Sequence, residues 1–236
     1  MFDAILFDLD GTLLDIDMNH FLPKYFGQMI QLAADKGLEH QGLPERVYRS
    51  TEAMLVNKDP RLTNREIFER DFWLDDVFPR HMFLPFFEEF YETRFDKLQA
   101  YAKPLPCTQG IISKVFGLGT KVVIATNSVF PDKAILKRLN WAGVGGFDYS
   151  LVTSYEVMHF TKPHPEYYEE ILEVLGLRPE RCLMVGNDVG EDMVAGRIGM
   201  KTFLVQDRLI NDKQLPIEVD WMGTQTALLE FLNGLA

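Results

Sequence analysis

The chain has 236 residues, of which 47% are hydrophobic and 12% aromatic, and its formal net charge is −11 at pH 7. This composition is sufficient for a buried core, and the acidic charge argues against a nucleic-acid surface, which needs clustered Lys and Arg. No apolar run reaches the eighteen or so residues that span a membrane. The two cysteines have no metal-ligand spacing, which favours a reducing compartment. We therefore expect a cytoplasmic protein without nucleic-acid or membrane partners.

The first predicted element is a short buried strand at residues 4–7, which leads directly into Asp8-Leu9-Asp10-Gly11-Thr12. Side chains two positions apart lie on the same side of an extended segment, so Asp8 and Asp10 are expected to project together. Burying two carboxylates is unfavourable unless something pairs with them. The natural partners are a divalent cation and a proton, so this motif is the first candidate for chemistry.

Residues 16–98 show no convincing alternating strand pattern. Aromatic, leucine and charged residues recur there at helical spacing, most densely over residues 83–95. Aromatic residues at this spacing usually form the core of a helical bundle, so the segment predicts a helical lobe, and no specificity residue is assigned within it. Residues 101–106 are expected to return the chain to the main domain.

From about residue 100 onward, short apolar runs alternate with helical patterns, which is typical of an α/β domain with a parallel sheet. The strands are predicted at residues 122–125, 150–152, 183–186 and 202–205. One helix contains residues 111–116, and another contains residues 168–175, between Pro165 near its start and Gly176 after its end. The predicted fold class is therefore α/β, with a Rossmann-like three-layer core of residues 1–15 and 99–236 and an inserted helical domain of residues 16–98.

Three further polar motifs follow predicted strands, at the edge where ligands bind in open α/β sheets. Thr126 and Asn127 offer a hydroxyl and backbone amides for phosphate oxygens, and Lys162 offers a point charge. Asp188, with Asp192 four residues later, suits an oxygen-liganded Mg²⁺ ion. Each motif alone is commonly a cap, a turn or a solvated loop. Together, in this order and each after a strand, they indicate one site.

The four motifs resemble those of the haloacid dehalogenase (HAD) superfamily, and the resemblance covers the full chain, with the helical lobe in the place of a cap domain. It implies that Asp8 is the nucleophile, Asp10 the general acid and base, and Thr126 and Lys162 the remaining catalytic residues. It also implies that Thr126, Asn127 and Lys162 bind the substrate phosphate, and that Asp8, Asp10 and Asp188 hold a Mg²⁺ cofactor.

One departure from the family pattern concerns the fourth motif, where Asn187 stands at a position that is often Asp. The acid pair of that motif is therefore either Asp188 with Asp192, or a pair with Asn187 in the first position. We prefer the former, because an anionic ligand binds Mg²⁺ better than an amide does.

The resemblance implies a Mg²⁺-dependent phosphatase that hydrolyses a small phosphorylated metabolite through an aspartyl-phosphate intermediate. The alternatives are a phosphomutase, a phosphonatase that uses an additional cap lysine, a metal-independent dehalogenase and a non-catalytic phosphometabolite-binding protein. Asp10 and Asp188 argue against the dehalogenase, and no cap lysine among Lys24, Lys36 and Lys58 is marked out for the phosphonatase. The substrate and the oligomeric state, monomer or homodimer, stay open.

Overall fold

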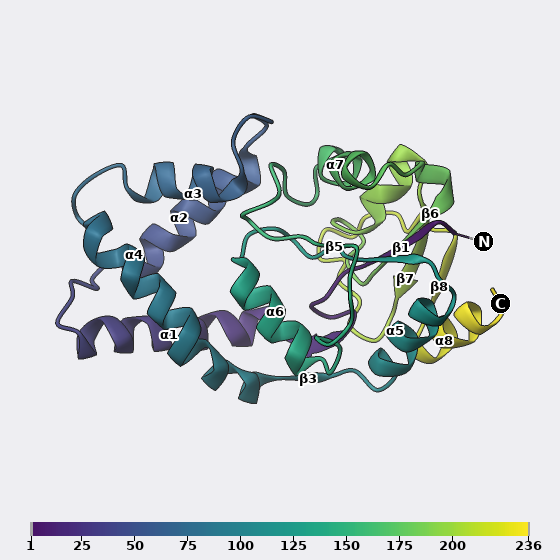
Figure 1. Ribbon diagram of the computed structural model, residues 1–236, viewed down its shortest axis with the longest axis horizontal. Helices are drawn as coiled ribbons and strands as arrows, with labels where there is room; N and C mark the ends of the chain where they lie inside the picture. Colours follow the sequence, from purple (N-terminus) through teal and green to yellow (C-terminus); the bar gives the residue numbers. More distant parts are fainter. Residues whose placement is uncertain (1, 236) are drawn as a thin grey trace.

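The computed structural model describes residues 2–235 and contains a six-stranded sheet in which each neighbouring pair of strands is parallel (Figure 1). The strand order is β5-β4-β1-β6-β7-β8. The strands are β1 (Ala4–Phe7), β4 (Lys121–Ile124), β5 (Leu151–Val152), β6 (Cys182–Gly186), β7 (Lys201–Val205) and β8 (Trp221–Gly223). β1 lies in the middle, between β4 and β6, so the carboxylates that follow it are placed at the centre of the sheet edge.

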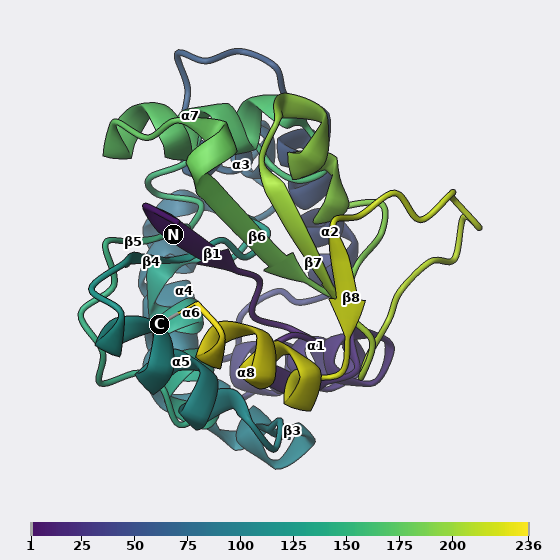
Figure 2. The ribbon, with the colours of Figure 1, turned by 90° about the vertical axis from the view of Figure 1, so that its right-hand side faces the viewer.

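Helices cover both faces of this sheet, as Figure 2 shows. On one face lie α5 (Thr108–Gly117) and α8 (Gln225–Asn233), and on the other lie α7 (Pro165–Leu175) and the 3₁₀-helix η4 (Met193–Ile198). Alternate residues of β1 divide between the two cores: Ile5 and Phe7 belong to the core of the α5–α8 face, and Ala4 and Leu6 to that of the α7 face. The predicted three-layer α/β fold is confirmed.

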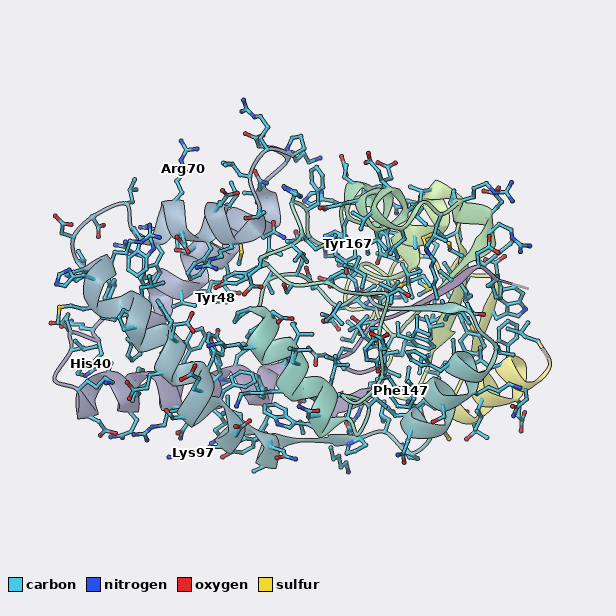
Figure 3. All side chains as sticks on the ribbon, viewed as in Figure 1. His40, Tyr48, Arg70, Lys97, Phe147 and Tyr167 are labelled. Carbon is cyan, nitrogen blue, oxygen red and sulfur yellow. The ribbon has the colours of Figure 1, made fainter. Side chains whose placement is uncertain are left out.

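The helical lobe occupies the left half of Figure 1. Its elements are α1 (Met18–Asp35), α2 (Leu43–Val56), α3 (Asn64–Phe72), α4 (Arg80–Glu89), the π-helical turn η1 (Phe90–Arg94) and the 3₁₀-helix η2 (Phe95–Tyr101). Figure 3 shows Arg70 and Lys97 projecting outward from the lobe, whereas aromatic side chains such as Phe83, Phe86 and Phe90 are buried. The lobe therefore has an aromatic interior and a charged exterior.

A two-stranded antiparallel ribbon joins the lobe to the core. It pairs β2 (Leu14–Ile16) with β3 (Ala102–Pro104). The ribbon was not predicted, because strands of three residues are too short to show a periodicity. Ile16 lies in β2 and η2 continues to Tyr101, so these elements extend across the boundaries predicted at 15/16 and 98/99. The division into two domains stays a prediction.

Two helices and one strand of the core also lay outside the sequence predictions. They are α6 (Asp132–Trp141), α8 and the edge strand β8. Buried Arg138 interrupts the apolar face of α6 that Ala134, Ile135 and Leu139 form, which hid its helical pattern. The four predicted strands are present with ends shifted by one residue. Within residues 2–235, no helix combines the length and the apolar character needed to cross a membrane.

Candidate active site

The carboxyl ends of the sheet strands bring the predicted residues together. Asp8 and Asp10 follow β1, Thr126 follows β4, Lys162 lies in the loop after β5, and Asp188 follows β6. Except for Lys162, which lies buried behind Asp8, these side chains and Asn127 line one cavity of about 260 Å³. Separate motifs therefore meet in space as the parallel sheet requires.

Lys162 is the buried cation of the site. Its Nζ donates hydrogen bonds to Asp8 Oδ1 (2.8 Å) and to Asp192 Oδ1 (2.6 Å), and its side chain is 1% exposed. Burial alone would lower the pKa of Lys162, but the carboxylates of Asp192 and Asp8 outweigh it and hold that pKa well above the ordinary value. Lys162 is therefore a fixed positive charge at neutral pH.

Thr12 lies beside the second carboxylate oxygen of Asp8, Oδ2. Its hydroxyl lies 3.2 Å from Asp8 Oδ2 and 2.9 Å from Asn187 Oδ1, and it can donate its single hydrogen to only one of them at a time. When Thr12 donates to Asn187, Asp8 Oδ2 keeps its lone pairs free. Since Lys162 occupies Oδ1, Oδ2 is the oxygen that is available to react.

Arg138 is a site residue that the sequence analysis missed. Its Nη1 donates to Asp10 Oδ2, its guanidinium lies 4.6 Å from the ring centroid of Phe130, and it is 1% exposed. Burial raises the pKa of Asp10, and the positive charge of Arg138 opposes that rise. The available signal was an arginine on the otherwise apolar face of α6, since charged residues are rarely buried unless paired.

Asp188 and Asp192 have different surroundings. Asp192 is 1% exposed, and its Oδ2 accepts a hydrogen bond from Asp188 N (2.9 Å) while its Oδ1 is held by Lys162. Burial raises the pKa of Asp192 to about 7, against the opposing effect of Lys162. Asp188 Oδ1 accepts hydrogen bonds from Gly190 N and Glu191 N, and its side chain lines the cavity. Asp192 thus anchors the lysine, and Asp188 faces the ligand space.

Position 186 requires glycine because the side chain of Asp192 occupies the space in which a Cβ would lie. A Cβ added at Gly186 would lie 2.2 Å from Asp192 Cγ, so Gly186→Ala must displace the carboxylate from Lys162. We expect a loss of about 3 kcal/mol of unfolding free energy, or roughly 10 °C in Tm, measured by differential scanning calorimetry. The matched control is Gly27→Ala inside α1, where a Cβ meets nothing within 4 Å and the helix should gain about 0.5–1 kcal/mol. Equal Tm changes in the two variants would contradict the packing argument.

Thr126, Asn127 and Asn187 complete the rim of the cavity. The Thr126 carbonyl accepts hydrogen bonds from Tyr167 Oη (2.7 Å) and Thr153 Oγ1 (2.8 Å), which fixes the backbone after β4. Asn127 Nδ2 donates to Glu191 Oε2 (3.2 Å). Asn187 Nδ2 donates to the Arg208 carbonyl (2.6 Å), so the Asn187 amide joins two loops while its Oδ1 faces Thr12.

The cavity has the donor set that a hard divalent cation prefers. Five carboxylates line it, those of Asp8, Asp10, Asp188, Glu191 and Asp192, and the nearby cations are Lys162 and Arg138. Asp10 Oδ1 is buried without a hydrogen-bond partner. Within residues 2–235, no three His, Cys, Asp or Glu side chains are already gathered as a metal cluster. An all-oxygen site with excess negative charge nevertheless fits Mg²⁺ in its chemistry.

Comparisons with known proteins find relatives that match most of the chain. The chain is 29% identical to the phosphoglycolate phosphatase of Aquifex aeolicus over 203 residues, which is 85% of this chain and 83% of the relative. It is 26% identical to the glyceraldehyde 3-phosphate phosphatase of Methanothermobacter thermautotrophicus, over 92% of each chain. Among solved structures, a HAD phosphatase from Thermococcus onnurineus has the same fold, with a TM-score of 0.58, 22% identity and 98% of each chain covered.

The sequence model of one family matches most of the chain. It is described as haloacid dehalogenase-like hydrolase, and it matches residues 2–198, from the strand before Asp8 to the end of η4. That range includes the carboxylates after β1, the lysine after β5 and the acidic loop after β6, and it includes the helical lobe. The chain therefore belongs to the haloacid dehalogenase-like hydrolase family.

Proposed function

We propose that this hydrolase is a Mg²⁺-dependent phosphatase that hydrolyses a small phosphorylated metabolite through an aspartyl-phosphate on Asp8. The observation that carries the proposal is the Asp8–Lys162–Asp192 arrangement, in which a buried lysine holds one oxygen of a carboxylate and leaves the other facing a cavity. The names of the two relatives, both phosphatases, support the same reaction class.

In the first half of the reaction, Asp8 Oδ2 forms a bond to phosphorus as the ester P–O bond breaks. Asp10 gives its proton to the leaving oxygen, and burial favours the protonated form that this role requires. Asp8 and a phosphate dianion repel one another, so the attack needs positive charge nearby. Lys162 supplies part of that charge at Asp8 Oδ1.

In the second half, water attacks phosphorus and the bond to Asp8 breaks, releasing inorganic phosphate. Asp10, now deprotonated, takes the proton of that water. Arg138, whose Nη1 is bonded to Asp10 Oδ2, keeps the carboxylate oriented between the two steps. Asp8, Asp10 and Asp188 would hold Mg²⁺, which supplies charge neutralisation for the phosphoryl oxygens.

The defining test of the proposed function is hydrolysis of p-nitrophenyl phosphate by the purified protein with Mg²⁺ and with EDTA. Turnover that requires Mg²⁺ supports a phosphatase. Metal-independent release of halide from a 2-haloacid would instead identify a dehalogenase, and a phosphoryl group that moves between two sugar carbons without phosphate release would identify a mutase. The absence of turnover on every phosphate ester tested would overturn the proposal in favour of a binding protein.

A phosphonatase is the least favoured of the alternatives. Lys36 is paired with Glu89 (2.6 Å), and Lys24 lies over the Tyr101 ring at 5.6 Å. In the described part of the chain, neither these lysines nor Lys58 contributes to the walls of the Asp8 cavity or of the neighbouring aromatic cavity. None of the three lobe lysines named above is therefore positioned to form a Schiff base at either cavity.

Mg²⁺ binding is expected to raise the Tm of the protein before any substrate is added. At ten times its dissociation constant the ion contributes about 1.4 kcal/mol, or about 3–5 °C for a chain of this size. Asp188→Asn should remove most of the shift, while the amide oxygen still accepts the hydrogen bonds from Gly190 N and Glu191 N. Thermal scans with MgCl₂, and with NaCl at matched ionic strength, check this. An equal shift in both proteins would exclude Asp188 as a ligand.

A further inference from the structure

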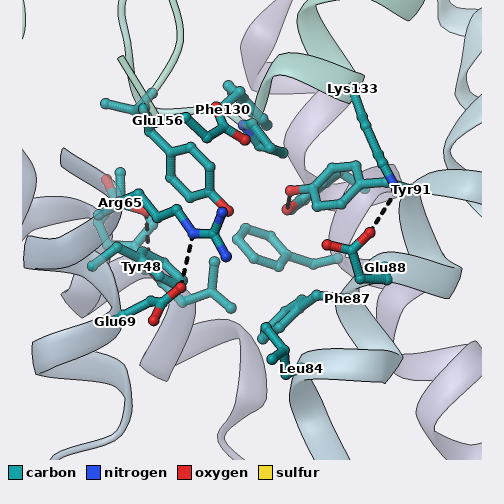
Figure 4. Close-up of a pocket in the computed structure, with 18 of the residues that line it drawn as sticks. Tyr48, Arg65, Glu69, Leu84, Phe87, Glu88, Tyr91, Phe130, Lys133 and Glu156 are labelled. Atoms are coloured by element: carbon teal, nitrogen blue, oxygen red, sulfur yellow. Dashed lines mark hydrogen bonds and ion pairs between the residues drawn. The ribbon is translucent and has the colours of Figure 1, made fainter. Parts of the chain in front are cut away.

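A second cavity, of about 230 Å³, lies between the helical lobe and the loop that follows β4 (Figure 4). We refer to it as the aromatic cavity, because its walls include Tyr25, Phe26, Phe68, Trp73, Phe87 and Tyr91. Met18, Val129 and Phe130 belong to the walls of both this cavity and the Asp8 cavity. The group esterified to a phosphate at Asp8 is thus directed toward the aromatic cavity.

The size and walls of the aromatic cavity suit one flat ring. A cavity of about 150 Å³ lined by Leu, Ile and Phe holds benzene, so 230 Å³ holds a single ring with small substituents. Tyr25 makes edge-to-face contacts with Phe26 (5.1 Å between centroids), Phe90 (5.3 Å) and Phe130 (5.8 Å). A further ring would extend this arrangement, which aromatic groups prefer.

The charges at the aromatic cavity disfavour a second anion on the substrate. Arg65 and Lys133 are its cations, and Figure 4 shows both of them bonded to carboxylates. Arg65 Nε donates to Glu69 (2.8 Å), and Lys133 Nζ donates to Glu88 (2.5 Å). Together with Glu156, three carboxylates therefore face two cations. A carboxylate on the leaving group would lose its water there without gaining an unpaired cation.

Hydrogen-bond donors remain available for neutral acceptor atoms. The hydroxyls of Tyr25 and Tyr91 are 2.7 Å apart, and only one of their two hydrogens is used in that bond. Burial raises the pKa of Tyr25 to about 12, so its hydroxyl stays protonated. Figure 4 also shows the Arg65 guanidinium reaching into the cavity, beyond the Nε that Glu69 accepts. Oxygen or nitrogen acceptors on a ring can be bound here.

We propose that the substrate is the phosphate monoester of an uncharged alcohol built on a single flat ring with hydrogen-bond acceptor atoms, and that the ring occupies the aromatic cavity. This inference rests on the proposed phosphatase function at Asp8. The cavity supplies binding energy to the leaving group, while the bonds that form and break are those given above for ester hydrolysis.

The test compares kcat/KM with Mg²⁺ for benzyl phosphate, 3-pyridylmethyl phosphate and 2-phosphoglycolate, with acetyl phosphate as a ringless reference. Each of the three esters releases a primary alcohol after protonation of the leaving oxygen by Asp10, so leaving-group chemistry differs little among them. We expect benzyl phosphate to exceed 2-phosphoglycolate by about 30-fold or more, as burial of a phenyl ring predicts. The pyridyl ester should exceed the benzyl ester about fivefold, from one added hydrogen bond.

The outcomes separate the two proposals. If acetyl phosphate is hydrolysed and 2-phosphoglycolate equals or exceeds benzyl phosphate, the ring assignment is overturned and the phosphatase stands. If the benzyl and pyridyl esters are equal, the assignment of acceptor atoms is overturned. If none of the four compounds is hydrolysed, the phosphatase itself is overturned, and the substrate assignment with it.

A matched pair of substitutions locates the ring. Val47 on α2 is 7% exposed and lines the aromatic cavity, whereas Val174 on α7 is 63% exposed and lies outside both cavities. Val47→Phe should lower the ratio of benzyl to acetyl phosphate kcat/KM about tenfold, by the volume it adds. Val174→Phe should leave the ratio unchanged. Equal ratios in both variants would place the ring elsewhere.

Overpacking at Val47 can also destabilise the lobe, which a lowered Tm would reveal. In that case, isothermal titration calorimetry on the unmodified protein tests whether the cavity prefers a ring to a carboxylate. Benzylphosphonate should bind more tightly than phosphonoacetate, which carries a carboxylate in place of the ring. Tighter binding of phosphonoacetate would overturn the inference.

Discussion

Asp8→Asn is expected to lower kcat for p-nitrophenyl phosphate by about 10⁴-fold or more, because the loss of a nucleophile removes the covalent route. The fold should survive, since asparagine has the same shape and the Lys162–Asp192 pair remains. Steady-state kinetics with Mg²⁺ and a thermal scan on the same preparation measure both effects. Acid-quenched mass spectrometry of the unmodified protein during turnover should detect the phosphorylated form, and the variant should not accumulate it.

The matched control for this substitution is Asp148→Asn, an exposed aspartate before β5. It removes the same charge and should leave kcat within twofold, because surface changes away from the site have small effects (about ±0.5 kcal/mol). Full activity in Asp8→Asn would show that the nucleophile assignment is wrong. Equal losses in the two variants would indicate a nonspecific charge effect.

Lys162→Met is expected to cost about 3–5 kcal/mol of unfolding free energy, because it leaves the buried carboxylates of Asp8 and Asp192 without their shared cation. Activity should also be lost, since the positive charge that Lys162 places at Asp8 Oδ1 no longer offsets its part of the repulsion between Asp8 and the substrate phosphate. Urea unfolding monitored by circular dichroism gives the first quantity, and p-nitrophenyl phosphate turnover the second.

The double variant Lys162→Met with Asp192→Asn separates the two roles of the lysine. Removing one of the two uncompensated carboxylates should recover a large part of the lost stability, with a coupling energy of about 1–3 kcal/mol. Activity should not return, because the charge beside Asp8 is still absent. Additive losses of stability would mean that the ion pair between Lys162 and Asp192 is energetically unimportant.

Features of this molecule that depend on neighbouring residues in the chain could be predicted from the sequence. β1 was predictable because four apolar residues precede two acids, and the other core strands because each is a short apolar run followed by polar residues. Their parallel pairing then brings Asp8 to Lys162, 154 positions later in the chain. The three-layer fold and the family are confirmed, and the roles of the individual residues remain predictions.

The features that escaped prediction depend on distant contacts. Arg138 pairs with a carboxylate 128 positions away, and although it lies on an otherwise apolar face of α6, the local sequence does not identify that carboxylate. β2 and β3 are each three residues long, and they pair with one another across the whole of the inserted lobe. The aromatic cavity likewise forms from side chains of several lobe helices, of α6 and of the loops after β4 and β5, so its shape cannot be derived from any one helical pattern.

Under the proposed mechanism, Phe130 connects the recognition of the leaving group to the catalytic acid. Its ring is a wall of both cavities and packs on the guanidinium of Arg138, whose other contact is Asp10. A substrate ring seated against Phe130 would restrain these contacts, so part of its binding energy would be used to fix Asp10 rather than to hold the ester. Truncated esters should therefore react with a lower kcat and not only with a higher KM. Selectivity would then be exerted on turnover itself, and small phosphorylated compounds could occupy the enzyme without being efficiently consumed.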